Sequence, residues 1–348
     1  MFSFRTLKES RFTCLVGIGL LLLVSFATKM QIVLVGGDTL KYGDALGISG
    51  ADILPSIYPL ELPLPFWILK IAALSGFPFQ SFFRILLSIF LTLTAIPTYF
   101  LAKSIYHSRS EALLCSALMV LNPSTIGYVR YGVFNNALGL PILLFGLLFL
   151  HRYFDKATHP KTNLMLFMIC MLLSVGTHTL TTGLLYLVSL FFLSFRIFGR
   201  RKLKLTQSEK PLLLFLVLLG AVLMALLVPF SYRYRKMSYL FDFNPSKITE
   251  RIPYGDLYYC SLVWVSLFSF YVLLANDLSR EHCIMLSIAA LAVATFVLSL
   301  ITFSSARYRF ENSMFLPYSL LMPLLIRKNS VLILIPFYAM MAYFGGIQ

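Results

Sequence analysis

Long apolar runs separated by short polar segments make up most of the chain and predict membrane-spanning helices. Their approximate limits are residues 13–35, 82–102, 111–122, 136–150, 163–176, 179–195, 211–229, 257–275, 284–303, 313–326 and 331–346. A helix of about 20 apolar residues crosses a bilayer. Several runs are shorter than this, so neighbouring runs can merge. The pattern predicts an all-α integral membrane protein with about 11 transmembrane helices, and about 10 to 12 as the range.

The composition excludes the soluble classes. Of 348 residues, 59% are hydrophobic and 12% are charged, whereas soluble domains are about 45–50% apolar and about 25% charged. The 32 Phe and 19 Tyr also exclude a disordered chain. The 5 cysteines are scattered without a Cys-x-x-Cys pair, so neither a disulfide framework nor a metal site is predicted. We find no internal repeat and no soluble domain, and expect one transmembrane domain over residues 1–348.

The basic residues predict the orientation. The net charge of +15 needs no nucleic acid partner, because cytoplasmic loops of membrane proteins are rich in Lys and Arg. Most basic residues become cytoplasmic when the N-terminus is cytoplasmic. The two sizeable polar segments, 36–81 and 230–256, then lie on the extracytoplasmic face. The N-terminal run resembles a cleavable signal peptide, but its apolar character continues to Val35. We therefore expect a retained helix whose Lys29 extends outward to the interface.

The first external loop carries the candidate catalytic residue. Asp38 directly follows the first apolar run, in Val35-Gly36-Gly37-Asp38. The glycines allow a sharp turn that directs the carboxylate over the helix bundle. Partial desolvation at the membrane surface increases the basicity of such a carboxylate, which suits a general base. The alternative is a solvated carboxylate that caps the next short helix.

The remainder of this loop is expected to be structured. Pro59, Pro63 and Pro65 argue against a regular helix there. The following apolar run from Trp67 to Leu74 predicts a short helix at the membrane interface. Candidate substrate contacts are Tyr42, Tyr58 and Glu61 in the loop, and His178 in a polar hairpin further along the chain. For His178, a hydrogen-bonded structural role is the alternative.

Three groups of arginines next to tyrosines form the other half of the candidate site. They are Arg307 and Arg309, Arg233 and Arg235, and Arg130. An arginine side chain binds phosphate through its planar fork, and neighbouring aromatic rings suit a sugar face. Anchoring to anionic lipid headgroups is the alternative for each group. Function is favoured for the group at 307–309, because arginine is costly at an outer helix end.

The sequence lacks the signature motifs of several other membrane-protein mechanisms. The sequence has no Walker motif and no His-Glu-x-x-His run, which argues against ATP-driven transport and zinc proteolysis. Charges in the middle of the apolar runs are nearly missing, unlike in ion pumps. Matching pairs of broken helices, typical of inverted-repeat transporters, are also missing.

Residues 36–103 resemble the N-terminal module of the GT-C glycosyltransferases. The resemblance is carried by Gly36-Gly37-Asp38, Tyr42, Tyr58-Pro59, Pro63, Pro65, Arg84 and Tyr99-Phe100-Leu101-Ala102-Lys103. It extends more loosely through Asn122-Pro123, the hairpin at His178 and the basic end at 307–309. The superfamily includes the protein mannosyltransferase and aminoarabinose transferase families. Unlike many members, this chain has Thr39 after Asp38 instead of a second acid and no WWD-type signature. A C-terminal soluble domain, which many members have, is not expected here.

The resemblance implies a cell-envelope enzyme that transfers sugar from a polyprenyl-phosphate-linked donor. The acceptor would be a lipid, glycan or protein on the extracytoplasmic face, and the transfer would invert the anomeric centre. Asp38 matches the acidic residue of the superfamily's first external loop. No cofactor is expected, and a divalent metal is not indicated. The alternatives are a lipid-linked oligosaccharide flippase or carrier, and a non-catalytic GT-C-like subunit of a glycosylation or polysaccharide polymerase complex.

Overall fold

The structure is a computed structural model of the chain, and α-helix is the only regular secondary structure in its described part. It describes residues 11–32, 34, 63–74, 76, 78–130, 133–154, 159–177, 179–198, 205–233, 269, 273, 280–301 and 315–327. Within these ranges no β-strand occurs. The predicted all-α class is therefore confirmed for the described residues.

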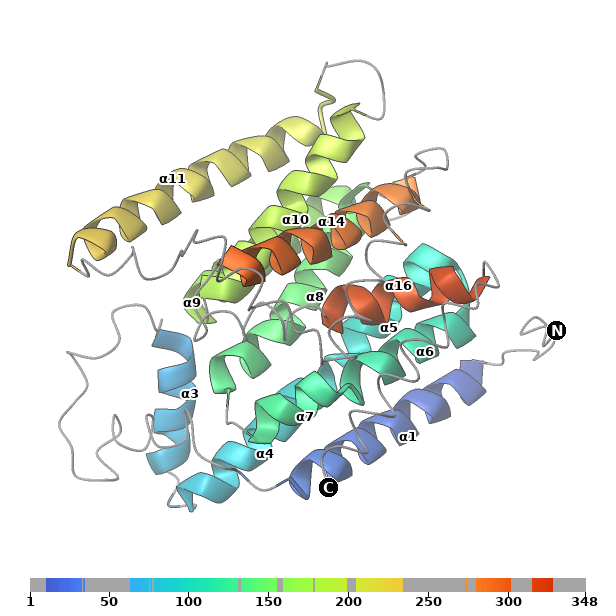
Figure 1. Cartoon of the computed structure of the whole chain (residues 1–348), viewed down its shortest axis with the longest axis vertical. Helices are drawn as coiled ribbons and strands as arrows, with labels where there is room; N and C mark the ends of the chain where they lie inside the picture. The colour runs from blue at the N-terminus through green and yellow to red at the C-terminus, as the bar shows by residue number, and fades with distance from the viewer. Residues whose placement is uncertain are drawn as a thin grey trace. The chain divides into compact units, whose positions relative to one another are not determined.

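The described helices follow most of the predicted apolar runs (Figure 1). Their bounds are α1 Arg11–Met30, α3 Pro63–Leu74, α4 Phe79–Leu93, α5 Ala95–Tyr106, α6 Arg109–Val120, α7 Pro123–Arg130, α8 Phe134–Phe154, α9 Pro160–Thr177, α10 Thr179–Phe198, α11 Glu209–Arg233, α14 Arg280–Ile301 and α16 Phe315–Arg327. The predicted runs 257–275 and 331–346 lie outside the described residues, apart from Ser269 and Leu273.

Five of the described helical segments are long and apolar enough to cross a membrane. They are Phe12–Met30, Phe79–Tyr106, Phe134–Phe154, Pro160–Thr177 and Leu180–Phe198. Several long apolar helices in one chain indicate a multi-pass membrane protein. The figure of about 11 spans, and the orientation, stay predictions.

The first compact unit, Met1–Leu185, contains the helices that position the candidate site. Within it α1 packs on α4 and α6, while α4 and α5 pack on α8. Helix α8 is buried along most of its length and also packs on α9. Helix α8 is therefore the core of this unit.

Helices α4 and α5 form a single 28-residue apolar segment with a break in the middle. Thr94 separates the two helices, and Pro97 lies in the first turn of α5. Proline has no backbone N–H, so it cannot continue the hydrogen-bond ladder of α4. The Thr94 hydroxyl donates to the Leu91 carbonyl (2.6 Å), and the Thr98 hydroxyl donates to the Thr94 carbonyl (2.7 Å). The break is thus held by side chains within the helix itself.

Small residues allow close packing between α8 and the start of α10. A Cβ atom at Gly139 would lie 3.0 Å from Thr181 Cβ and would overlap Thr181 Oγ1. A Cβ atom at Gly146 would lie 2.8 Å from Leu185 Cδ2. Gly139 and Gly146 therefore lie where side chains of α10 fill the space, a typical arrangement for helices packed inside a membrane.

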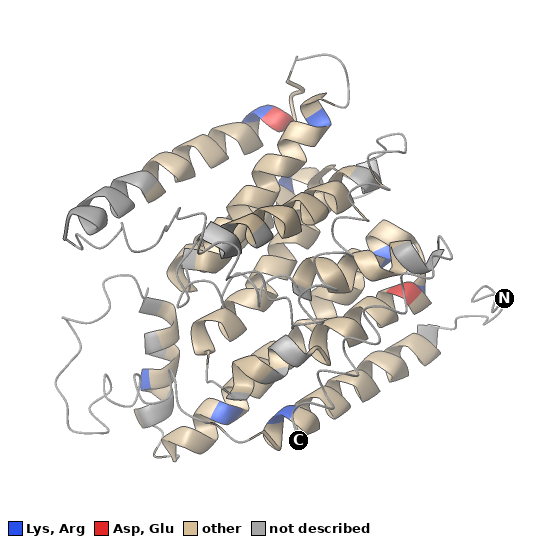
Figure 2. Cartoon of the chain, in the orientation of Figure 1, with Lys and Arg blue, Asp and Glu red and all other residues tan. Residues whose placement is uncertain are grey.

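The second compact unit, Tyr186–Gln348, contains most of α10 together with α11, α14 and α16. The Tyr186 hydroxyl donates to the Leu216 carbonyl of α11 at 3.1 Å. Helices α14 and α16 contact each other. Figure 2 shows that the charged residues of the described helices lie mostly toward helix ends, as a membrane environment favours.

One predicted boundary is wrong. Helix α3 begins at Pro63 and includes Pro65, although the prolines were expected to keep this segment non-helical. The first turn of a helix has no intrahelical partner for its N–H groups, so proline is tolerated there. Helix α11 continues to Arg233, so the segment expected to form a loop from residue 230 is helical at its start.

Candidate functional site

The predicted catalytic and substrate-contact residues are not described by the structure. Asp38, Tyr42, Tyr58, Glu61, His178, Arg235, Arg307 and Arg309 lie outside the described residues. Arg130 and Arg233 are the last residues of α7 and α11, and only their backbone is described. Their proposed roles therefore stay predictions.

A different polar group is described in the first unit, around a buried lysine at the end of α1. The Lys29 side chain is only 1% exposed. Its ammonium donates to Ser25 Oγ and to the Val120 carbonyl, both at 2.6 Å. The prediction that Lys29 extends outward to the membrane interface is wrong for this reason.

The position of Val120 explains why the ammonium turns inward. Val120 is the last residue of α6, and carbonyls in the last turn of a helix have no intrahelical donor. The C-terminal end of a helix also carries partial negative charge, which attracts a cation. Helix α6 packs on α1. Lys29 therefore finds its acceptor within the bundle.

Hydroxyl groups extend this network onto two neighbouring helices. Ser25 Oγ lies 3.1 Å from Thr92 Oγ1 of α4. The Thr125 hydroxyl of α7 lies 3.1 Å from the Val120 carbonyl and 2.7 Å from the Asn122 carbonyl, to both of which it donates. The network thus links α1, α4, α6 and α7 at one end of the unit.

Helix α4 carries further polar side chains on the face that meets α1. Arg84, Ser88 and Thr92 follow at intervals of four residues, which places them along one side of a helix. Ser88 is fully buried, and neither its hydroxyl nor Arg84 Nε has a hydrogen-bond partner among the described residues. The amide of Asn136 in α8, 6% exposed, is likewise without a partner there. Buried polar atoms usually have hydrogen-bond partners, so this group calls for an explanation.

The titratable side chains of this group, Lys29 and Arg84, are both basic. Both described partners of Lys29 are neutral oxygens, and no described carboxylate contacts it. The described residues also contain no group of three or more His, Cys, Asp or Glu side chains that could hold a metal ion.

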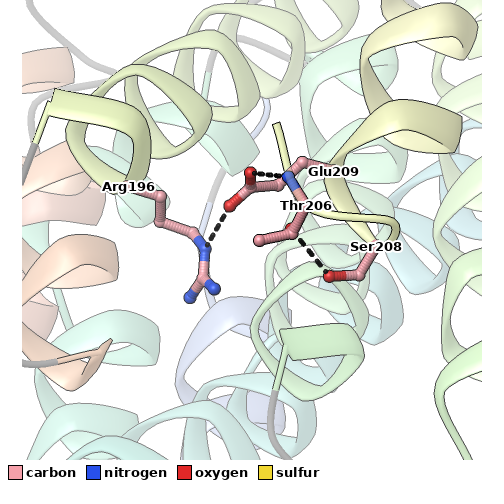
Figure 3. Close-up of polar contacts among 4 residues, drawn as sticks. All are labelled: Arg196, Thr206, Ser208 and Glu209. Carbon is pink, nitrogen blue, oxygen red and sulfur yellow. Dashed lines mark hydrogen bonds and ion pairs between the residues drawn. The ribbon is translucent and has the colours of Figure 1, made fainter. Parts of the chain in front are cut away.

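The second unit contains an ion pair with a structural role (Figure 3). Arg196 Nε of α10 lies 3.5 Å from Glu209 Oε1 of α11, and the Glu209 side chain is fully buried. The Thr206 N–H donates to Glu209 Oε2 at 2.9 Å, as in a helix capping box. Arg196 also lies over the Phe192 ring, 5.7 Å from its centroid. These contacts join the end of α10 to the start of α11.

No protein-family model matches the chain, and no curated protein matches it.

Sequence reasoning missed the polar group around Lys29, although one signal was present. Ser25 and Lys29 are four residues apart in an otherwise apolar run, which places both on one face of α1. Ser88 and Asn136 gave no such signal, because isolated serine and asparagine side chains are common in apolar helices.

Proposed function

We propose that the chain is an inverting membrane glycosyltransferase that uses a polyprenyl-phosphate-linked sugar on the extracytoplasmic face. The observation that carries the proposal is the position of Asp38, in a Gly-Gly-Asp turn just after a long apolar helix. Helix α1 ends at Met30, which is consistent with Asp38 following a membrane span. The resemblance of residues 36–103 to the GT-C module supports the same assignment.

In the proposed mechanism Asp38 accepts the proton of the acceptor hydroxyl. The hydroxyl oxygen attacks the anomeric carbon while the bond from that carbon to the phosphate oxygen breaks. Polyprenyl phosphate leaves, and the single displacement inverts the anomeric centre. A positioned general base contributes about 10²–10⁴-fold to the rate.

Arginines are assigned to the leaving group. Arg307 and Arg309, with Arg130, Arg233 and Arg235 as further candidates, would neutralise the phosphate charge that develops as the bond breaks. Charge-assisted hydrogen bonds from arginine to phosphate suit this role. The tyrosines, Glu61 and His178 are assigned to contacts with the sugar or the acceptor.

The test compares membranes that contain the unaltered chain, Asp38→Asn or Asp44→Asn at matched expression. Sugar transfer from a radiolabelled polyprenyl-phosphate donor pool is measured, together with donor binding. We expect Asp38→Asn to lose at least about 10²-fold in transfer, as for removal of a general base, with donor binding unchanged. Asp44→Asn, in the same loop, is the matched control. Full transfer by Asp38→Asn would assign the base elsewhere.

A variant of the predicted phosphate group tests the second half of the mechanism. Arg307→Ala should weaken donor binding or raise the donor concentration needed for half-maximal transfer, because it removes a charge from the leaving group site. An unchanged donor dependence would contradict the role of Arg307.

A lipid-linked oligosaccharide carrier is the second candidate. The observation that favours it is the set of buried polar side chains within apolar helices, since carriers place polar groups inside the membrane. It predicts donor movement across proteoliposome membranes that does not depend on Asp38. A non-catalytic subunit, the third candidate, predicts donor binding without transfer unless partner proteins are added.

A further inference from the structure

The C-terminal ends of α5 and α8 lie at the same end of the first unit. Near the start of α8, the Phe134 ring contacts the Phe83 and Phe90 rings of α4, at centroid distances of 5.2 Å and 5.9 Å. Near the end of α8, the guanidinium carbon of Arg152 lies 5.9 Å from the centre of the Phe100 ring in α5. Helix α8 therefore runs in the same direction as α4 and α5, on both of which it packs.

Two further helices begin at this end of the unit. Helix α6 begins at Arg109, shortly after α5 ends at Tyr106, and packs on α5. Helix α9 begins at Pro160, shortly after α8 ends at Phe154, and packs on α8. The four helix ends carry the residues that we call the basic end of the unit, namely Lys103, His107, Arg109, Arg152, His159 and Lys161.

The described residues of the basic end carry more positive than negative charge. Two lysines and two arginines lie there, whereas Glu111, in the first turn of α6, is the one described carboxylate on the same helix ends. Lys103 and Lys161 are exposed, and Arg109 and Arg152 are partly exposed. A surface with this balance of charge attracts anions.

The basic end lies where lipid headgroups are expected. The segments Phe79–Tyr106, Phe134–Phe154 and Pro160–Thr177 are each long and apolar enough to cross a membrane. All three have one of their ends here, and a helix that crosses a bilayer leaves the hydrocarbon at its ends. The four lysine and arginine side chains are therefore within reach of the headgroups of one leaflet.

Aromatic rings lie beside two of these cations. The Lys103 ammonium is 5.9 Å from the centre of the Tyr99 ring, and the Phe100 ring lies between Tyr99 and Arg152, 5.5 Å from Tyr99 by ring centroids. A ring face attracts a cation. The Phe100 side chain is 41% exposed, so it can contact acyl chains while the charged groups stay among the headgroups.

We propose that the basic end binds the headgroups of anionic phospholipids. Basic side chains at a helix end are attracted to a leaflet that carries net negative charge, and arginine forms paired hydrogen bonds with phosphate. A zwitterionic phospholipid has the same phosphate without the net charge. It therefore serves as the comparison.

The basic end is separate from the end of the unit at which α1 ends. The Lys29 ammonium, near the end of α1, contacts the carbonyl of Val120 at the end of α6. The basic end contains the opposite end of α6, which begins at Arg109. The inference therefore goes beyond the proposed transferase, because it needs neither Asp38 nor a sugar donor.

The test titrates the purified full-length chain in detergent with phosphatidylglycerol or phosphatidylcholine of identical acyl chains. Native mass spectrometry measures the Kd of the first bound lipid molecule. The variants are Lys103→Gln alone and Lys103→Gln combined with Arg152→Gln. Lys70→Gln, which alters an exposed lysine of α3 outside the basic end, is the matched control. Size-exclusion profiles verify that each variant is folded.

We expect the unaltered chain to bind phosphatidylglycerol more tightly than phosphatidylcholine. One basic residue near an anionic leaflet is worth up to about fivefold in affinity, so Lys103→Gln should raise the Kd for phosphatidylglycerol severalfold and the double variant about tenfold. The Kd for phosphatidylcholine, and both Kd values of Lys70→Gln, should be unchanged.

Three results would each overturn the proposal. They are equal binding of the two lipids by the unaltered chain, an unchanged Kd in the Lys103 and Arg152 variants, and an equal rise in Lys70→Gln. The single variant alters an exposed side chain, so it decides the question if the double variant does not fold.

This inference and the proposed transferase fail separately. Selective binding of phosphatidylglycerol should persist in Asp38→Asn, because Asp38 is not part of the basic end. Lipid selectivity in a chain that transfers no sugar would remove only the transferase. Sugar transfer by a chain that binds both lipids equally would remove only the lipid site.

Discussion

Glu209 illustrates how single residues stabilise the described part of this protein. Its carboxylate is fully buried at the start of α11, where it accepts from the Thr206 N–H and lies beside Arg196. Removing the carboxylate would leave the Arg196 guanidinium and the Thr206 N–H, both partly buried, without this acceptor. Losing the acceptor of a buried donor costs about 1–3 kcal/mol.

We therefore expect Glu209→Ala to lower the free energy of unfolding by about 1–3 kcal/mol, on the scale of a lost buried acceptor. Glu209→Gln should cost less, because its side-chain oxygen still accepts from the Thr206 N–H. Thermal unfolding in detergent measures both. Lys210→Ala, which alters the exposed neighbour, should change little, and an equal loss in Lys210→Ala would contradict the assigned role.

The direction of the Lys29 side chain could not be predicted from the sequence. The sequence places Ser25 and Lys29 on one face of α1, but it does not say which face meets the bundle. That depends on α4 and α6, whose partner atoms Thr92 Oγ1 and Val120 O are far along the chain. A lysine near a helix end has two outcomes, outward to water or inward to a carbonyl, and only tertiary contacts decide between them.

At the scale of elements, the close packing of α8 against α10 predicts that a larger residue at position 139 lowers the stability of the protein. Gly139→Ala places a methyl group against the Thr181 side chain, next to the α10 backbone. Overpacking of this kind costs about 1–3 kcal/mol. Thermal unfolding in detergent should show a lower midpoint for this variant.

Two further substitutions, both in α10, serve as the control and as a compensating change. Gly183→Ala meets no atom within 4 Å and should be neutral or slightly stabilising, because alanine favours helix. Adding Thr181→Ala to Gly139→Ala should restore part of the lost stability, since it removes the overlapping hydroxyl. Equal effects of Gly139→Ala and Gly183→Ala would show that packing against Thr181 is unimportant.

The apolar pattern predicted most described helices to within a few residues, because each run has to be helical in lipid. It placed α8 at 136–150, and the helix extends to Phe134 and Phe154. Polar residues at helix ends are still helical, so an apolar run is shorter than its helix. The break at Thr94 was not predicted, because Pro97 lies inside an apolar run that the pattern alone cannot divide.

At the scale of the whole molecule, the orientation is a prediction that labelling can test. In a background without its five cysteines, Gln80→Cys and Lys161→Cys each introduce one thiol at an exposed helix start. We expect a membrane-impermeant maleimide to label Gln80→Cys in intact cells. Lys161→Cys should react only after the membrane is permeabilised.

The reverse pattern would invert the topology and place the loop of Asp38 in the cytoplasm. Such a result would also remove the extracytoplasmic assignment of the proposed transferase.

The number of spans could not be predicted from sequence more closely than about 10 to 12, because the runs at 111–122 and 313–326 are shorter than the about 20 residues that cross a bilayer. Helices α6 and α16, which correspond to these runs, have 12 and 13 residues.

The burial of Lys29 has a consequence for how the protein is made. Its carbonyl acceptor, Val120, is separated from it by 91 positions in the chain. At about 5–20 residues per second, α1 enters the bilayer on the order of 10 s before that acceptor is synthesised. During this interval an unpartnered ammonium near the end of a helix is most stable at the headgroups. We therefore expect the arrival of α6 to draw the lysine inward, so that α1 reaches its final depth or rotation only after α6 has been inserted.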